Sequence, residues 1–202
     1  MLKSALSKSL IVVGIVGSIL MFNSCSYTKP EKQDADSIDI NEDYYEFQAF
    51  DMTDHGVKAY IFLPDETANI GASTKPDVRH IQDDIYWEIN VGPNFSMQIE
   101  DYASISNLVK VEKKELDTKK FFKVRYLVDD KDLIVYERIL LVKGTDKASP
   151  LVGVEHKTYH VYGQKTIDGV TYALESREEG FEKKIIELMA KSIRSFKSKT
   201  AS

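Results

Sequence analysis

The sequence predicts an α+β domain, an antiparallel sheet of six to eight strands with a mid-chain helix and a C-terminal helix packed on it. Three observations predict this class. Most of the chain after residue 44 consists of short strand-like runs joined by turns rich in Gly, Asp and Asn. One mid-chain segment and the last long segment instead repeat apolar residues at helical spacing. The turns are short, and short turns join antiparallel strands.

The first two strands are expected at residues 46–52 and 57–63. Asp54-His55-Gly56 lies between them and places a glycine where a hairpin needs a positive φ angle. Pro64 then ends the second strand, because proline cannot donate to a strand ladder. Residues 65–83 are polar and lack a clear period, so we expect a long loop there.

The next hairpin is expected at residues 86–91 and 95–101, around Gly92-Pro93-Asn94. Its strict alternation of apolar and polar residues predicts a sheet with one buried face. The residues predicted to face the core are Trp87, Ile89, Val91, Phe95, Met97 and Ile99, and those predicted to face away are Glu88, Asn90, Ser96, Gln98 and Glu100.

Residues 103–116 carry apolar side chains at helical spacing and predict the mid-chain helix. Two strands follow at residues 121–128 and 133–142, joined by a turn at 129–132. The second of these strands is apolar on both faces, which predicts a central strand covered on both sides.

A loop is expected at residues 144–150, followed by the last hairpin at 155–167 and 170–175. Asp168-Gly169 is a strong signal for its turn. The closing helix should begin at a capping box made by Ser176 and Glu179. Its core-facing stripe is predicted to consist of Phe181, Ile185, Leu188, Met189, Ile193 and Phe196.

This order of elements resembles the PsbP-like fold over residues 46–197. The resemblance includes the opening hairpins, the mid-chain helix, the long antiparallel strands and the closing segment Ser192-Ile193-Arg194-Ser195-Phe196-Lys197. It implies a role typical of that family, whose members are mostly non-catalytic accessory proteins that dock on larger complexes.

The N-terminus predicts export and a lipid anchor. Two lysines precede an apolar run from Leu10 to Phe22, about 13 residues, whereas a spanning helix needs about 20. Ser24-Cys25 follows, and this arrangement resembles the lipobox of bacterial lipoproteins. The resemblance implies a diacylglyceryl thioether and acyl chains such as palmitate on Cys25, and Ser26 resembles the outer-membrane sorting class. The alternative is an ordinary secreted protein that is cut near the same place.

We therefore predict a signal peptide at 1–24, a lipidated cysteine with a flexible acidic linker at 25–43, and one domain at 44–202. The alternative for the linker is a folded arm docked through Ile38 and Ile40.

Removing the signal peptide takes the formal charge from −5 to −7, which argues against nucleic acid as a partner. The domain has no cysteine, which excludes an internal disulfide and a thiolate site. The sequence does not indicate an oligomeric state.

No familiar catalytic or nucleotide-binding motif occurs, so we predict neither an enzyme nor a cofactor. The predicted function is a non-catalytic, lipid-anchored binding or assembly module of the bacterial cell envelope, with an envelope protein as its partner. One alternative is an envelope enzyme that uses the 65–84 loop, with His80 as acid or base and Asp77 or Asp84 as its partner. Another is a small-ligand carrier with an apolar cavity between sheet and helix.

The residues selected as a possible binding site are Asp77, Arg79, His80, Asp83 and Asp84, which cluster titratable side chains at the end of the long loop. His156 and His160 would lie about 13 Å apart on a strand, too far to share a zinc ion, so we expect a half-exposed strand face. The acidic residues Asp129, Asp130 and Asp132 are expected as turn residues rather than calcium ligands. Edge packing is expected of Tyr44, Tyr45 and Phe47, with a partner anchor as the alternative.

Overall fold

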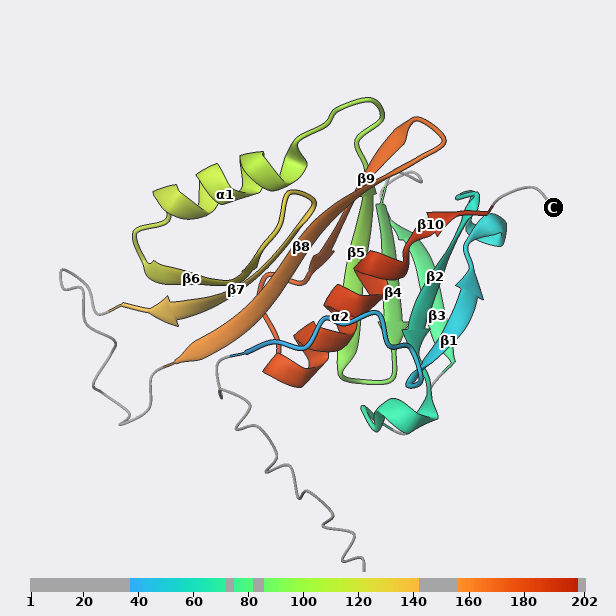
Figure 1. Ribbon diagram of the computed structural model, residues 1–202, viewed down its shortest axis with the longest axis horizontal. Coiled ribbons are helices and arrows are strands. Elements are labelled where there is room, and N and C mark those ends of the chain that lie inside the picture. The colour runs from blue at the N-terminus through green and yellow to red at the C-terminus, as the bar shows by residue number, and fades with distance from the viewer. Residues whose placement is uncertain (1–36, 72–74, 82–85, 142–155, 200–202) are drawn as a thin grey trace, which may run out of the picture. The chain divides into compact units, whose positions relative to one another are not determined.

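The computed structural model describes residues 37–71, 75–81, 86–141 and 156–199 (Figure 1). In this part of the chain the larger sheet has seven strands, all antiparallel, in the order β3-β4-β5-β9-β8-β7-β6. The predicted α+β class and the predicted number of strands are confirmed. The strands are β3 (Pro76–Ile81), β4 (Tyr86–Val91), β5 (Phe95–Asp101), β6 (Phe122–Asp129), β7 (Leu133–Leu140), β8 (Lys157–Ile167) and β9 (Val170–Ser176).

Some predictions concern residues outside the described ranges. They are the signal peptide at 1–24, Cys25, Ser26, residues 27–36 of the linker, Asp83, Asp84 and the loop at 144–150. These stay predictions.

The large sheet is two meanders joined at one strand pair. Strands β3, β4 and β5 form the first meander, and β6 to β9 form the second. The turns follow the sequence: Asp168 and Gly169 adopt φ angles of 50° and 88°, which a tight hairpin turn requires. The backbone N–H of Asp130 donates to the carbonyl of Leu133 at 2.9 Å and closes the β6–β7 turn. The pairing of β5 with β9 then joins the two meanders.

A smaller three-stranded sheet contains β1 (Phe47–Asp51), β2 (Ala59–Pro64) and β10 (Lys197–Ser198) (Figure 1). The β1–β2 hairpin was expected, and short 3-10 helices follow each of its strands, η1 (Thr53–His55) and η2 (Glu66–Ala68). Strand β10 was not expected. The closing helix stops at Ser195, and the next residues pair with Tyr60 and Ala59 of β2.

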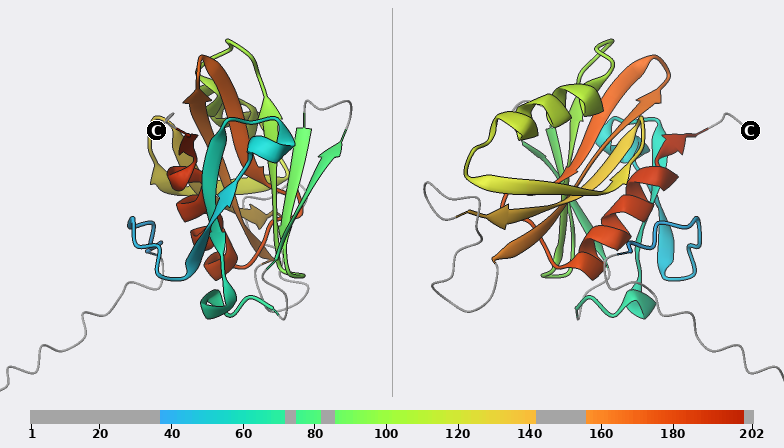
Figure 2. Two further views of the ribbon diagram at one scale, coloured as in Figure 1. Left: turned by 90° about the vertical axis from the view of Figure 1, so that its right-hand side faces the viewer. Right: turned by 60° about the vertical axis from the view of Figure 1, so that its left-hand side comes forward.

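The two helices lie on opposite faces of the large sheet, so that β7 is covered on both sides as the sequence predicts (Figure 2). In β7, Leu133 and Val135 belong to a large core cluster with helix α2 (Lys183–Ser195), whereas Ile134 and Tyr136 belong to a smaller cluster with helix α1 (Leu108–Thr118). The six alternating residues predicted to face the core at β4 and β5 are all in the large cluster. Among the described residues, no helix has the length and apolar character needed to cross a bilayer.

Helix α2 packs on β2 and β8 at close range. At Gly163 of β8, an added Cβ atom would lie 2.5 Å from Cγ2 of Ile193, which is too short for a non-bonded contact between two carbon atoms. The absence of a side chain at this strand position therefore lets the helix approach the sheet.

Both helices begin later than predicted. Helix α1 starts at Leu108, because Asn107 turns the chain with a φ angle of 66° and leaves Ile105 exposed. The predicted capping box is wrong: Ser176 lies at the end of β9, where its hydroxyl accepts the backbone N–H of Val161 at 3.2 Å. That bond across the sheet satisfies Ser176, and α2 begins seven residues further on without a side-chain cap.

The predicted loop at 65–83 is wrong in part, because it contains η2 and the edge strand β3. An edge strand has only one neighbour and exposes much of its surface, so polar residues suit it. Its alternation is present but weak: Val78 packs on the large core cluster, whereas Asp77 and Arg79 are exposed. A polar strand of this kind is difficult to distinguish from a loop by periodicity alone.

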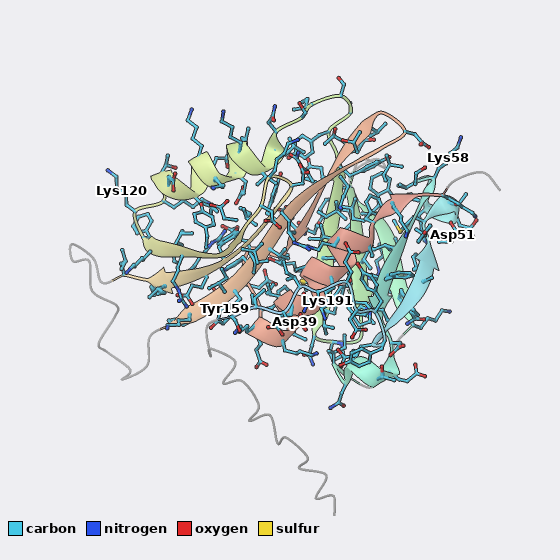
Figure 3. All side chains as sticks on the ribbon, in the orientation of Figure 1. Asp39, Asp51, Lys58, Lys120, Tyr159 and Lys191 are labelled. Atoms are coloured by element: carbon cyan, nitrogen blue, oxygen red, sulfur yellow. The ribbon has the colours of Figure 1, made fainter. Side chains whose placement is uncertain are left out.

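The predicted linker boundary at residue 43 needs moving, because residues 37–43 contact the domain. Ile38 and Ile40 pack against the large core cluster. The Asp39 carboxylate accepts from Nζ of buried Lys191 at 3.3 Å, and the two side chains meet beside α2 in Figure 3. The backbone N–H of Asp39 also donates to Glu187 at 3.3 Å. This part of the linker is therefore the docked arm that stood as the alternative.

Candidate functional site

A polar cavity of about 300 Å³ lies over β7, β8 and β9, on the face of the sheet that carries α1. We call it the Arg138 cavity. Unlike the clusters that build the core, it is lined almost entirely by polar and charged side chains. Its lining residues are Gln98, Glu112, Lys119, Tyr136, Arg138, His160, Val161, Glu175, Ser176 and Glu178.

The register of the sheet brings these residues together from distant parts of the chain. Tyr136 of β7 lies directly opposite His160 of β8, and the two-residue period of a strand puts Arg138 on the same face as Tyr136. Glu175 of β9 faces Gln98 on the neighbouring strand β5. Helix α1 adds Glu112 from above the sheet.

Arg138 is buried, with 7% of its surface exposed, and no carboxylate among the described residues contacts it. Its Nη1 donates to the carbonyl oxygen of Glu178, and its Nη2 donates to the hydroxyl of Tyr136, each at 3.3 Å. The rings of Tyr136 and Phe122 lie 5.5 and 5.7 Å from the guanidinium carbon. Nε of Arg138 is buried and has no hydrogen-bond partner.

Two carboxylates lie on the same cavity in an unfavourable setting for negative charge. Burial raises the pKa of Glu175 to about 7, and the charges of Glu112 and Glu100 add to this effect. Burial likewise raises the pKa of Glu112, whose Oε1 accepts from the hydroxyl of Tyr136 at 3.4 Å. Within the described part of the chain, Glu175 makes no ion pair. The cavity thus combines an unmatched guanidinium with a carboxyl group that titrates near neutral pH.

His160 forms the floor of the cavity beside Tyr136. Its ring stacks on that of Tyr136 at 5.3 Å and 14°, and its Nε2 lies 2.9 Å from the hydroxyl of Thr158. Burial, with the nearby charge of Arg138, lowers the pKa of His160 to about 3, so the ring is neutral. The strand position was predicted, but the half-exposed environment was not: only 2% of His160 is exposed. His156 stands just before β8 and is exposed.

The three predicted site residues that the structure describes, Asp77, Arg79 and His80, do not converge. Asp77 and Arg79 form an ion pair on one face of β3. His80 lies on the other face, where its ring packs edge-on against Trp87 at 5.0 Å and its Nε2 lies 2.7 Å from the carbonyl oxygen of His55. Because successive residues of a strand point to opposite faces, Asp77 cannot serve as the partner of His80. That pairing was wrong; Asp84 is outside the described residues.

The remaining candidates have structural partners. Tyr44 packs on Phe47 and Phe62, with ring centroids 5.6 and 4.8 Å apart, whereas Tyr45 is exposed. The predicted turn at 129–132 is confirmed, and its aspartates accept from side chains of α1, β8 and α2: Lys113 on Asp129, Gln164 on Asp132 and Arg194 on Asp130. Among the residues that the structure describes, no three His, Cys, Asp or Glu side chains group in a way that could hold a metal ion.

The Arg138 cavity was missed, although the sequence held a signal for it. The strand predicted at 133–142 is apolar on both faces, yet Glu137 and Arg138 stand in its middle. A charged residue within a covered strand is costly unless a counter-ion, hydrogen bonds or a ligand compensate for its charge. Glu175 and His160 gave no comparable signal, because their neighbourhood depends on the pairing of strands far apart in the chain.

Comparisons of this chain with models of protein families, with curated proteins and with solved structures gave no match.

Proposed function

We propose that this protein is a non-catalytic, lipid-tethered binding module of the bacterial cell envelope, and that its Arg138 cavity holds a small ligand with an anionic group. The observation that carries the proposal is Arg138 itself. Its guanidinium is buried, contacts only neutral oxygen atoms and leaves Nε without a partner at a polar cavity.

A buried charge is costly unless an opposite charge or hydrogen bonds compensate for it. A carboxylate or phosphate in the cavity would accept two parallel N–H bonds from an arginine, the geometry that gives such pairs their strength and specificity. The ring of Phe122 and the hydroxyl of Tyr136 hold the guanidinium in place, so little ordering would remain to be done on binding. The volume of about 300 Å³ suits a small metabolite.

Binding is best tested by calorimetry with simple anions, acetate and phosphate first. Arg138→Gln should abolish binding, because a neutral amide cannot replace the guanidinium. Arg79→Gln is the matched control, since Arg79 is an exposed arginine on β3. The bound molecule should be recovered unchanged, which NMR of the mixture would check. Equal affinity in the Arg138→Gln variant would overturn the proposed site, and conversion of the molecule would favour an enzyme.

The tether is a proposal that rests on Cys25 and the apolar run before it. Two or more acyl chains hold a protein stably at a membrane, at about 0.8 kcal/mol for each buried methylene group. The resemblance to PsbP-like accessory proteins supports a binding role at the envelope, and Ser26 supports the outer membrane. Cys25→Ser should abolish incorporation of a fatty-acid analogue and release the protein from membranes; equal labelling of both forms would contradict the anchor.

A second candidate function, docking on an envelope protein, is favoured by Phe121. This side chain is 74% exposed just before β6, between the exposed lysines Lys120 and Lys123. Aromatic residues, phenylalanine among them, are enriched in the cores of protein interfaces. A photo-crosslinking residue at position 121 should capture a single envelope protein in intact cells, whereas the same residue at exposed Val111 of α1 should not. Equal capture at both positions would contradict a specific interface.

A further inference from the structure

We infer that the ligand of the Arg138 cavity is a zwitterion, with a carboxylate held by Arg138 and an ammonium group held by Glu175. This inference rests on the proposed function and names the chemical class of its ligand. It comes from an unusual pair of observations: a cation and a carboxylate line one cavity, and they do not pair with each other.

The strand register explains why these two charges stay apart. Arg138 of β7 lies opposite Thr158 of β8, whereas Glu175 of β9 lies opposite Tyr162 of β8. The backbone positions of the two residues are thus separated by two strand spacings, about 10 Å, and by four residues along β8, about 13 Å. No ion pair joins the two side chains, although the charge of Arg138 acts on Glu175 and opposes the rise in the pKa of its carboxyl group. The cavity occupies the space between them.

The other charged groups of the cavity do not replace this pair. Glu112 accepts from the hydroxyl of Tyr136, and the contact of Glu178 with Arg138 uses its backbone carbonyl rather than its carboxylate. Lys119 stands at the end of α1 and is exposed. A ligand with only an anionic group would therefore satisfy Arg138. Its negative charge would, however, lie in the same cavity as the Glu175 carboxylate, and nothing would compensate for the repulsion between the two.

An ammonium group beside Glu175 removes that conflict. It offers three donors to a carboxylate that has no ion-pair partner among the described residues, and its charge favours the ionised form that burial disfavours. One molecule that carries both groups would then match both unpaired charges at once. Free amino acids, ω-amino acids and the termini of short peptides belong to this class.

Calorimetric titration of the full chain with glycine, β-alanine, 4-aminobutanoate and 5-aminopentanoate would test the inference and measure the spacing of the charges. One member should bind best, and it should bind at least about tenfold more tightly than its N-acetyl form or its methyl ester, each of which lacks one charge. Arg138→Gln and Glu175→Gln should each weaken its binding by about tenfold or more. Glu179→Gln, an exposed glutamate outside the cavity, is the matched control.

The outcomes separate this inference from the proposed function. If the N-acetyl form binds as well as its parent, and Glu175→Gln has no effect, the zwitterion is overturned while anion binding at Arg138 stands. If none of these molecules binds, and simple anions do not bind either, both are overturned. Thermal melts of each variant show whether it is folded; a Glu175→Gln variant that is folded, binds the N-acetyl form and loses the parent zwitterion supports the inference.

Discussion

Glu137 and Arg138 are neighbours in β7 and both are buried, but among the described residues only Glu137 has an ion-pair partner. Glu137 has 1% of its surface exposed and receives two hydrogen bonds from Arg125 across the strand pair, at 2.7 and 3.0 Å. Arg138 faces the other side of the sheet, where it donates only to a backbone carbonyl and a hydroxyl and forms no ion pair with a described residue. A matched pair of this kind belongs to the fold, whereas an unmatched guanidinium at a cavity is available to a ligand.

Arg138→Met should leave the free energy of unfolding within about 1 kcal/mol of the unsubstituted protein, or raise it, because a buried charge is exchanged for an apolar side chain of similar length. Glu137→Gln should instead lower it by about 1–3 kcal/mol, since Arg125 loses its counter-ion. Urea melts of both variants would measure the difference. A loss at Arg138→Met as large as that at Glu137→Gln would show that Arg138 serves the fold.

His160 should make the fold sensitive to acid. Its pKa is lowered to about 3 by burial, whereas an unfolded chain protonates histidine near pH 6.5. The fold therefore has its full contribution from His160 above about pH 6.5 and loses it as the pH falls toward 3, by about 1.4 kcal/mol for each pH unit. Between pH 6.5 and 5 the protein should lose about 2 kcal/mol more than His160→Gln, measured by urea melts at both values. Parallel losses in the two proteins would contradict a buried neutral ring.

At the scale of elements, the hairpins could be predicted because local chemistry decides them. Asp168-Gly169 needs positive φ angles, and the alternation in β4 and β5 leaves one apolar face to bury. The boundaries of the helices and the strand β3 could not, because tertiary contacts decide them. Ser176 reads as a helix cap until β8 supplies a backbone N–H for its hydroxyl, and β3 is a strand only because β4 pairs with it.

Five of the six residues of the predicted stripe are buried, which confirms the predicted face of the closing helix, whereas Phe181 lies before α2 in a bridge to Tyr159. This gives a matched pair of substitutions. Ile185→Ala should lower the free energy of unfolding by about 2–5 kcal/mol, because it removes packed methyl groups from the large core cluster. Lys184→Ala should cost less than about 1 kcal/mol, since Lys184 is exposed and contributes only its ion pair with Glu46 at 2.9 Å. Urea melts would compare them, and similar losses would mean that α2 is rotated about its axis.

At the scale of the whole molecule, the number of strands and the two covered faces of the sheet could be predicted. Which strands lie next to each other in the sheet could not. The pairing of β5 with β9 joins residues far apart in the chain, and no local pattern in either strand names its partner. The Arg138 cavity depends on this same pairing, because Gln98 meets Glu175 only there. The candidate site could therefore not be predicted, because it depends on a strand order that no local pattern reveals.

The docked arm should contribute to global stability. Replacing Ile38 and Ile40 together by alanine should lower the free energy of unfolding by about 1–3 kcal/mol, because each is partly buried against the large core cluster. Asn41→Ala is the control, since Asn41 is an exposed residue of the same segment. A chain that begins at Tyr44 should lose a similar amount and still unfold cooperatively. Unchanged thermal melts in the double variant would mean that the arm does not bind in solution.

The contact between β2 and the C-terminal end of α2 has a consequence for how the protein is made. The backbone N–H of Phe62 donates to Ser195, a residue 133 positions later in the chain. At about 5–20 residues per second, a ribosome needs about 7–27 s to synthesise that interval. The β1–β2 hairpin lacks this contact until Ser195 has been synthesised, so the fold is completed only after that residue has emerged. A chain that has not finished folding can still pass through a narrow channel, which is the state that the proposed export across a membrane requires.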